Sequence, residues 1–116
     1  MKENKLIELS MEFSVKVIKL CEGIQGHFSL LDQLERAATS IGANIHEANY
    51  GQSRADFIHK LQIALKECYE TEYWLKLLVR SELAERETID PLYDQCGTIR
   101  RVLVAAINTA KANTKE

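Results

Sequence analysis

The chain has 116 residues, with 46% hydrophobic and 28% charged residues and a formal net charge of −2. This length suits one folded domain over residues 1–116, and one proline with five glycines excludes the many turns of an all-β fold. The mildly acidic balance is unlike the strongly basic composition of most nucleic-acid-binding domains, and no apolar run approaches the ~18 residues of a membrane span.

The first half of the chain predicts two helices. The first covers about residues 4–23 and ends near Gly23 and Gly26, which suit a helix C-terminus. The second covers about residues 30–49, with Ser29 as the expected N-cap. Apolar residues recur in both at spacings of three and four, the helical period. The expected buried positions are Leu6, Leu9, Phe13, Val17, Leu20, Leu34, Ala38, Ile41, Ile45 and Ala48.

The second half predicts two longer helices. A turn at Gly51-Gln52 leads into a helix over about residues 54–82, with Ser53 as N-cap and Asp56 three residues later. The last helix covers about residues 90–113, with Pro91 in its first turn and Thr88 or Asp90 as the cap. The expected buried positions are Phe57, Leu61, Ala64, Cys68, Leu75, Val79, Leu92, Cys96, Ile99, Leu103, Ala106 and Ala110.

Short connections between long helices favour antiparallel neighbours, so the predicted fold is all-α, an antiparallel up-down-up-down four-helix bundle. Apolar residues exceed one stripe per helix, which predicts a subunit interface and hence a homo-oligomer. A wide core stripe with scattered surface apolar residues is the alternative. The surplus residues are Ala43, Ile58, Ile63, Leu65, Tyr69, Trp74 and Leu77.

Residues 33–47 carry a stripe of small or polar side chains beside their apolar seam. The stripe consists of Gln33, Ala37, Ser40 and Asn44, with Arg36 and Glu47 further round the helix. Short side chains that can form hydrogen bonds indicate close helix–helix contact with specific polar pairing rather than chemistry.

A hairpin centred on Gly51-Gln52 places Arg36 level with Glu67. The same register places Gln33 level with Glu70. On one of the two possible bundle handednesses, this flank faces Glu67, Thr71 and Trp74. We therefore predict an ion pair between Arg36 and an acidic residue of the third helix or of a neighbouring subunit. The alternative is a binding site formed by Arg36, Glu67 and Glu70.

The residues that could carry chemistry are few. Asp56-x-x-His59 is the nearest approach to the Glu-x-x-His pairs of di-iron bundles, but no second pair exists on another helix. Cys21 and His27 straddle a turn without a recognisable catalytic signature. The three cysteines show no CxxC spacing and are expected to be reduced thiols. We expect no metal, no cofactor and no enzymatic activity.

Nucleic-acid contact is a weaker possibility. The densest basic spot is Arg100-Arg101, with Lys111 downstream, and an oligomer would multiply it. These three residues are the tentative nucleic-acid contacts, and an ordinary solvated helix face is the alternative. The tyrosines and the tryptophan of the second and third helices are expected to lie away from this charge, which leaves no stacking platform for bases.

Two segments carry a family resemblance. The first is Gln33-Leu34-x-Arg36-Ala37-x-x-Ser40-Ile41-x-Ala43-Asn44-Ile45-x-Glu47. The second begins with Ser53-x-Ala55-Asp56-Phe57 and continues with Ile63-Ala64-Leu65-Lys66-Glu67-Cys68-x-Glu70-Thr71-Glu72-Tyr73-Trp74-Leu75. In these residues the chain resembles the four-helix-bundle proteins encoded by intervening sequences of bacterial 23S ribosomal RNA genes. It departs from them at Ala48, where the family often has glycine.

The resemblance implies an antiparallel bundle that assembles as a homopentamer around a central channel. Related proteins are accessory subunits of diversity-generating retroelements, and those are strongly basic, whereas this chain is mildly acidic. Together with the absence of a signal-peptide core at the N-terminus, the resemblance leads us to expect a cytoplasmic, non-enzymatic interaction protein. Its expected partners are further copies of itself and RNA or a nucleoprotein; a protein-only scaffold is the alternative, and a metal-dependent enzyme a remote one.

Overall fold

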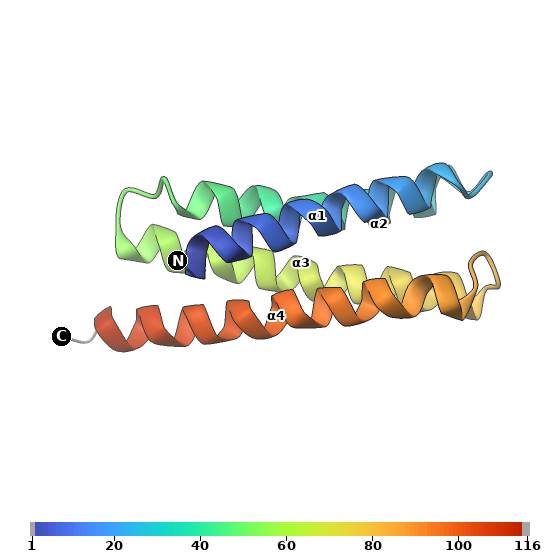
Figure 1. The fold of residues 1–116 in the computed structure, drawn as a ribbon. Helices are drawn as coiled ribbons and strands as arrows, with labels where there is room; N and C mark the ends of the chain where they lie inside the picture. Colours follow the sequence, from blue (N-terminus) through green and yellow to red (C-terminus); the bar gives the residue numbers. More distant parts are fainter. Residues whose placement is uncertain (1, 115–116) are drawn as a thin grey trace.

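Four α-helices make up the fold, in a computed structural model that describes the backbone of residues 2–114 and the side chains of residues 5–113. The helices are α1 (Lys2–Glu22), α2 (Phe28–Ala48), α3 (Arg54–Arg80) and α4 (Arg86–Thr114). They run alternately up and down, so both termini and the α2–α3 turn lie at one end of the bundle (Figure 1). The predicted all-α four-helix bundle is confirmed.

The helices form a closed ring in which α1 contacts α2, α2 contacts α3, α3 contacts α4, and α4 returns to α1. The bundle measures 51 × 21 × 20 Å. Its length follows from α4, because 29 residues at about 1.5 Å per residue span most of that dimension. Such a thin rod has a single core along its axis, to which every helix contributes one stripe.

Helices α1, α2 and α4 begin earlier than predicted, and in α2 and α4 the shift removes the expected cap. α2 starts at Phe28, after His27 in a left-handed conformation, so Ser29 lies inside the helix and does not cap it. α4 starts at Arg86, which places Thr88 and Asp90 inside the helix and Pro91 beyond its first turn. The early start of α4 places Ile89 in the core at 2% exposure, and this burial helps to offset the backbone hydrogen bond that Pro91 cannot donate.

The predicted start of α3 is confirmed. The Ser53 side chain accepts a hydrogen bond from the Asp56 backbone N–H at 3.2 Å, and the Asp56 carboxylate accepts one from the Gln52 N–H at 3.2 Å. The turn before it is tight, because a Cβ atom on Gly51 would lie 3.2 Å from that of Asp56 and 3.3 Å from the Ala48 carbonyl oxygen. These contacts explain the glycine and the serine at the turn.

Most predicted stripe positions form the core, and the fully buried side chains include Phe13, Ile41, Leu75 and Leu103. Five predicted positions are only partly buried and pack against the core: Leu9, Leu20, Phe57, Val79 and Ala106. Residues buried outside the predicted stripes include Ser10, Leu31, Thr71, Glu72, Leu78, Ile89 and Ile107. Gly42, which lies outside the predicted polar stripe, is where α1 and α2 approach each other, because a Cβ atom there would lie 3.4 Å from the Ser10 hydroxyl of α1.

The surplus apolar residues differ in exposure. Ile58, Leu65 and Trp74 pack against the core of the chain itself, so they give no support to a subunit interface. Ile63 and Leu77 are half-buried, whereas Ala43 is exposed and Tyr69 is 54% exposed. Helix α1 adds exposed apolar residues that were not predicted, Met11 at 61% and Val15 at 47%.

The close approach at Gly42 predicts how this position responds to substitution. Gly42→Leu should lower the free energy of unfolding by about 1–3 kcal/mol, because the side chain must displace Ser10. Gly42→Ala should be neutral or stabilising by up to about 1 kcal/mol, since alanine favours helix and meets only the edge of the hydroxyl. Urea denaturation measures both, with Ala43→Leu on the exposed side of α2 as the control. Equal stability of the two leucine variants would contradict this account.

Candidate interaction surfaces

The predicted ion pair of Arg36 is present within one chain. Its guanidinium lies against two carboxylates of α3, with Nη1 3.5 Å from Glu67 Oε2 and Nη2 hydrogen-bonded to Glu70 Oε2. The indole Nε1 of Trp74 donates to the same Glu70 oxygen at 3.1 Å. The α2 flank therefore faces the Glu67–Trp74 flank of α3, one of the two arrangements that the sequence left open.

This cluster fits a structural contact between α2 and α3 better than a ligand-binding site. The Glu67 side chain is 15% exposed and the Glu70 side chain 33%, while that of Arg36 is 50% exposed. The hydrogen bond from Trp74, followed by that from Arg36, lowers the pKa of Glu70 below its ordinary value. The cation is thus matched by carboxylates of its own chain.

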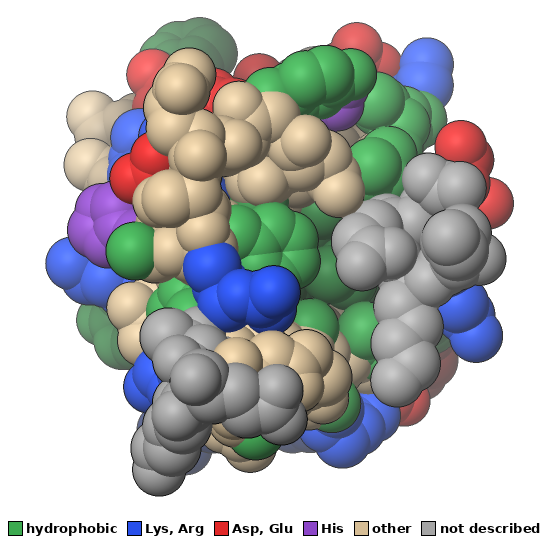
Figure 2. All heavy atoms as spheres, turned by 90° about the vertical axis from the view of Figure 1, so that its left-hand side faces the viewer, with side chains coloured by type: hydrophobic (Ala, Val, Ile, Leu, Met, Phe, Trp, Pro, Cys, Tyr) green, Lys and Arg blue, Asp and Glu red, His purple; other side chains and the backbone are tan. Residues whose placement is uncertain are grey.

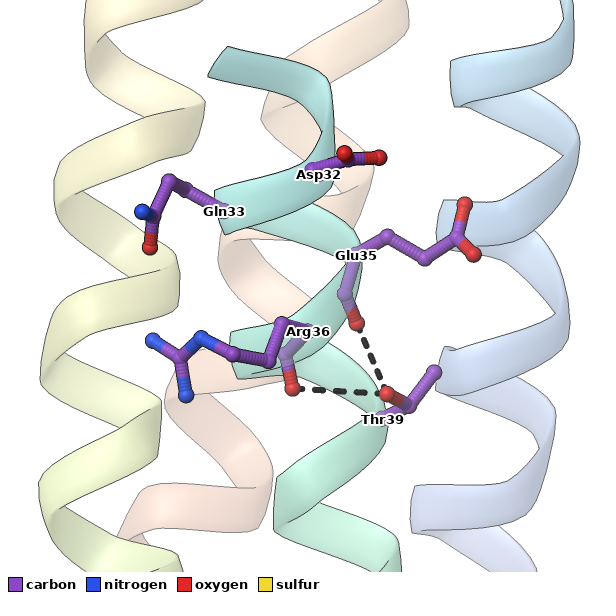
Figure 3. A pocket seen from close by; sticks show the side chains of 5 residues that line it. All are labelled: Asp32, Gln33, Glu35, Arg36 and Thr39. Atoms are coloured by element: carbon purple, nitrogen blue, oxygen red, sulfur yellow. Dashed lines mark hydrogen bonds between the residues drawn. The ribbon is translucent and has the colours of Figure 1, made fainter. Parts of the chain in front are cut away.

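The polar stripe of α2 bonds within its own helix. Asn44 donates its side-chain N–H to the Ser40 carbonyl oxygen at 2.8 Å, so the expected pairing of Asn44 with the next helix is not formed. Gln33 is exposed and lines an open hollow of about 330 Å³. Figure 3 shows that all five residues lining this hollow come from α2, and that its two hydrogen bonds run from the Thr39 hydroxyl to α2 carbonyls. The polar side chains that line this hollow therefore do not point toward a common centre where a ligand could bind.

Glu47 also contacts α3. Lys60 donates a hydrogen bond to its carboxylate at 2.7 Å, and this bond lowers the pKa of Glu47. Together with the Arg36 contacts, it places two ion-pair groups along the α2–α3 hairpin. The signature residues Glu47, Glu67, Glu70 and Arg36 therefore all lie at one helix–helix boundary.

A second cluster lies between α3 and α4 and combines cations with aromatic rings. Arg100 donates from Nε to Glu72 at 2.8 Å, and its guanidinium lies 5.5 Å from the centre of the Tyr69 ring. Lys76 lies 5.7 Å from the centre of the Tyr93 ring. The prediction that aromatic rings lie away from the basic residues is therefore wrong.

The three tentative nucleic-acid contacts do not form one patch. Arg100 turns toward α3 and its ion pair with Glu72. Arg101 is exposed, donates to the Thr98 hydroxyl at 3.3 Å, and lines a pocket at the end of the bundle. Lys111 is exposed in the last turn of α4.

The candidate catalytic groups are unsuited to nucleophilic chemistry. Burial, with the nearby carboxylates of Glu35 and Asp32, raises the pKa of Cys21 to about 11, so its thiol stays protonated at neutral pH. Cys96 donates to the Cys68 carbonyl oxygen at 3.5 Å in the core, and hydrogen bonding with Cys96 raises the pKa of Cys68.

Within the described residues, no cluster of three or more His, Cys, Asp or Glu side chains is arranged to hold a metal ion. In the same part of the chain, no helix has the length and apolar character needed to cross a membrane.

Sequence reasoning missed the contacts that Tyr69, Glu72, Lys76 and Tyr93 make at the α3–α4 boundary. Level pairing across the α3–α4 turn brings Lys76 level with Tyr93 and Tyr69 level with Arg100 only when the hairpin is centred between Ala84 and Glu85. The predicted helix ends at residues 82 and 90 place the centre later, so they give a different register.

Comparison with known proteins gives a consistent picture. The family model described as 23S rRNA-intervening sequence protein matches residues 2–105. A crystal structure of a protein with unknown function from the S23 ribosomal protein family of Bacteroides thetaiotaomicron VPI-5482 has a TM-score of 0.88 and 43% sequence identity. The match covers 93% of this chain and 99% of that one. No curated protein matches the chain.

The Trp74–Glu70 hydrogen bond predicts a pH-dependent contribution to stability. Because the folded-state pKa of Glu70 lies below its ordinary value of 4.5, the stabilisation is complete above that pH and is lost as the pH falls through the lower folded-state value. Trp74→Phe removes the donor and should cost about 0.5–1.5 kcal/mol at neutral pH. The variant should then lose less stability than the wild type on acidification.

Urea denaturation followed by circular dichroism at neutral pH and at about pH 3.5 makes this measurement, since Trp74 is the single tryptophan. Tyr73→Phe is the control, because Tyr73 is the exposed neighbour of Trp74. Parallel acid losses in the wild type and Trp74→Phe would show that the hydrogen bond does not set the pKa of Glu70.

Proposed function

The chain belongs to the 23S rRNA-intervening sequence protein family, and from the aromatic and basic residues on α3 and α4 we propose that it is an RNA-binding interaction protein. In this proposal it is non-enzymatic, cytoplasmic and homo-oligomeric, and it binds single-stranded RNA either alone or within a nucleoprotein. The observation that carries the RNA-binding role is the pair of exposed tyrosines on α3, Tyr69 and Tyr73, at a boundary where Arg100 and Lys76 also lie against tyrosine rings.

The geometry of these side chains suits unpaired bases. Tyr69 and Tyr73 are 54% and 58% exposed, and they lie four residues apart on the same side of α3. Exposed rings of this kind can stack on bases, at about 1–3 kcal/mol per base. Arg100 lies against the Tyr69 ring while it is also paired with Glu72, and Lys76 lies against the ring of Tyr93 on α4. Lys76 is therefore the exposed cation of this boundary that is available to a phosphate backbone following the stacked bases.

Local charge supports this role better than the net charge suggests. The nearby carboxylate of Glu72 is paired with Arg100, and that of Glu70 shares Arg36 with Glu67, which reduces their repulsion of phosphate. Lys66 is exposed on the same helix, three residues before Tyr69. An oligomer repeats this surface once per subunit, so weak single contacts add up along one RNA strand.

The proposed assembly uses helix α1. Met11 and Val15 are exposed one helical turn apart, and the partly buried Ile7 and Ile18 extend them into an apolar stripe. A soluble chain gains by covering such a stripe, and a second copy of α1 or of its neighbours provides an apolar partner. The family resemblance points to five subunits around a central channel.

RNA binding can be tested with fluorescent oligouridine by anisotropy. We expect binding at low salt whose affinity falls steeply as salt rises, because phosphate contacts release counterions. Tyr69→Ala/Tyr73→Ala should weaken binding at least about tenfold through lost stacking. Tyr50→Ala is the matched control, since Tyr50 is 74% exposed at the distant α2–α3 turn.

Two outcomes would contradict the proposal. Absence of binding at low salt would favour the protein-only scaffold. An equal effect of the Tyr50 and Tyr69/Tyr73 substitutions would remove the α3–α4 surface from the RNA site. Circular dichroism of each variant establishes that the bundle remains folded.

Assembly can be tested separately by light scattering after size-exclusion chromatography. The wild type should have the mass of five subunits, and Met11→Glu/Val15→Glu should shift it toward the 13.2 kDa of one chain, because burying two carboxylates in an apolar interface is unfavourable. Val104→Glu, at another exposed valine, is the control and should leave the mass unchanged. A monomeric wild type at micromolar concentration would overturn the assembly proposal.

A further inference from the structure

The end of the bundle that carries the termini contains an apolar pocket of about 460 Å³. It lies between the first turns of α1 and α3 and the last turns of α2 and α4. Figure 2 looks onto this end and shows hydrophobic side chains exposed in a central hollow, with a Lys or Arg side chain across its edge. Its apolar wall consists of Leu6, Ile45, Phe57, Leu61, Val102, Ala105, Ala106 and Ala110.

The sequence of α4 explains why this space is open. Further along α4 the core positions are Ile99 and Leu103, which are fully buried. Toward the end of the helix the lining residues become small, with Ala105, Ala106 and Thr109 facing the space. The other three helices contribute larger side chains but do not reach across it. The volume falls within the roughly 300–1,000 Å³ of small-molecule sites.

Among residues 5–113, the charged side chains that line the pocket are all basic. They are Lys5, Arg54 and Arg101, and no acidic side chain of this range lines it. All three cations are exposed, and no ion pair joins any of them to a carboxylate among the side chains of residues 5–113. This contrasts with Arg36 and Arg100, whose charges are matched within the chain. An apolar cavity bounded by unmatched cations is complementary to an anion with an apolar tail.

We propose that this pocket binds an aliphatic monocarboxylate of medium chain length, with the alkyl tail among the alanines of α4 and the carboxylate at Arg54, Arg101 and Lys5. A tail of medium length contacts the apolar wall from a carboxylate held at the rim, and a neutral molecule would leave the three cations without an anionic partner. This site is separate from the tyrosines of the proposed RNA surface and does not depend on that function.

Octanoate is the probe, titrated into the full chain by isothermal calorimetry. We expect saturable binding of one octanoate per chain. Octanol should bind at least about fivefold more weakly, because it cannot form charge-assisted hydrogen bonds with the rim. Acetate should show no binding, because it lacks the tail.

Substitutions separate the two halves of the site. Arg54→Gln and Arg101→Gln should each weaken octanoate binding about 3–10-fold and leave octanol binding unchanged. Arg86→Gln is the matched control, since Arg86 is also the exposed first residue of a helix but lies at the opposite end of the bundle. Ala106→Leu should fill the pocket and abolish binding of both ligands, and Ala112→Leu, exposed on α4 outside the lining, should not.

Several results would overturn the proposal. These are the absence of saturable octanoate binding, equal affinities for octanoate and octanol, and an Arg86→Gln effect as large as that of Arg54→Gln. If Ala106→Leu fails to fold, the arginine variants still decide the question, because they are surface substitutions. Retained RNA binding in a chain that fails the octanoate test would show that the two proposals are independent.

Discussion

Arg36 reaches from α2 to two carboxylates of α3, and this contact fits only one register of the central hairpin. Burial of the apolar stripes supplies far more free energy than a half-exposed ion pair, whose contribution is about 1 kcal/mol or less. Apolar stripes tolerate a shift of one helical turn better than a guanidinium between two carboxylates does. The cluster therefore acts on specificity, and α1 and α4 pack on a hairpin whose alignment it favours.

Spacing along the sequence predicts the buried stripes because a helix repeats its faces at a fixed angle. It fails where contacts with other helices determine the helix boundary. Burial of Ile89 favours a start of α4 at Arg86, five residues before Pro91, rather than at about residue 90. Level pairing finds Arg36 and Glu67 because both lie near the same tight turn. It does not foresee that Asn44 bonds to its own helix, since that choice depends on the separation of α2 and α3 at one side chain.

The net charge of −2 describes the surface poorly. Glu72 pairs with Arg100 and Glu47 pairs with Lys60, while Glu67 and Glu70 share Arg36, so three cations offset most of the field of these carboxylates. A chain can thus be mildly acidic in composition and still present local positive regions. The electrostatic potential at each part of the surface depends on which charged side chains are paired. That pairing follows from how the helices pack, and the number of charged residues does not reveal it.

Arg100 and Arg101 illustrate the same distinction at the smallest scale. As neighbours in sequence they read as one basic spot, yet successive residues of a helix point about 100° apart and do not share a face. Arg100 turns into the α3–α4 boundary, where Glu72 and the Tyr69 ring hold it. Arg101 turns to the open end of the bundle, where small residues of α4 leave an apolar cavity beside it. The two neighbouring arginines therefore belong to two different surfaces. Whether the charge of each one is matched depends on the side chains that lie against its own face of α4.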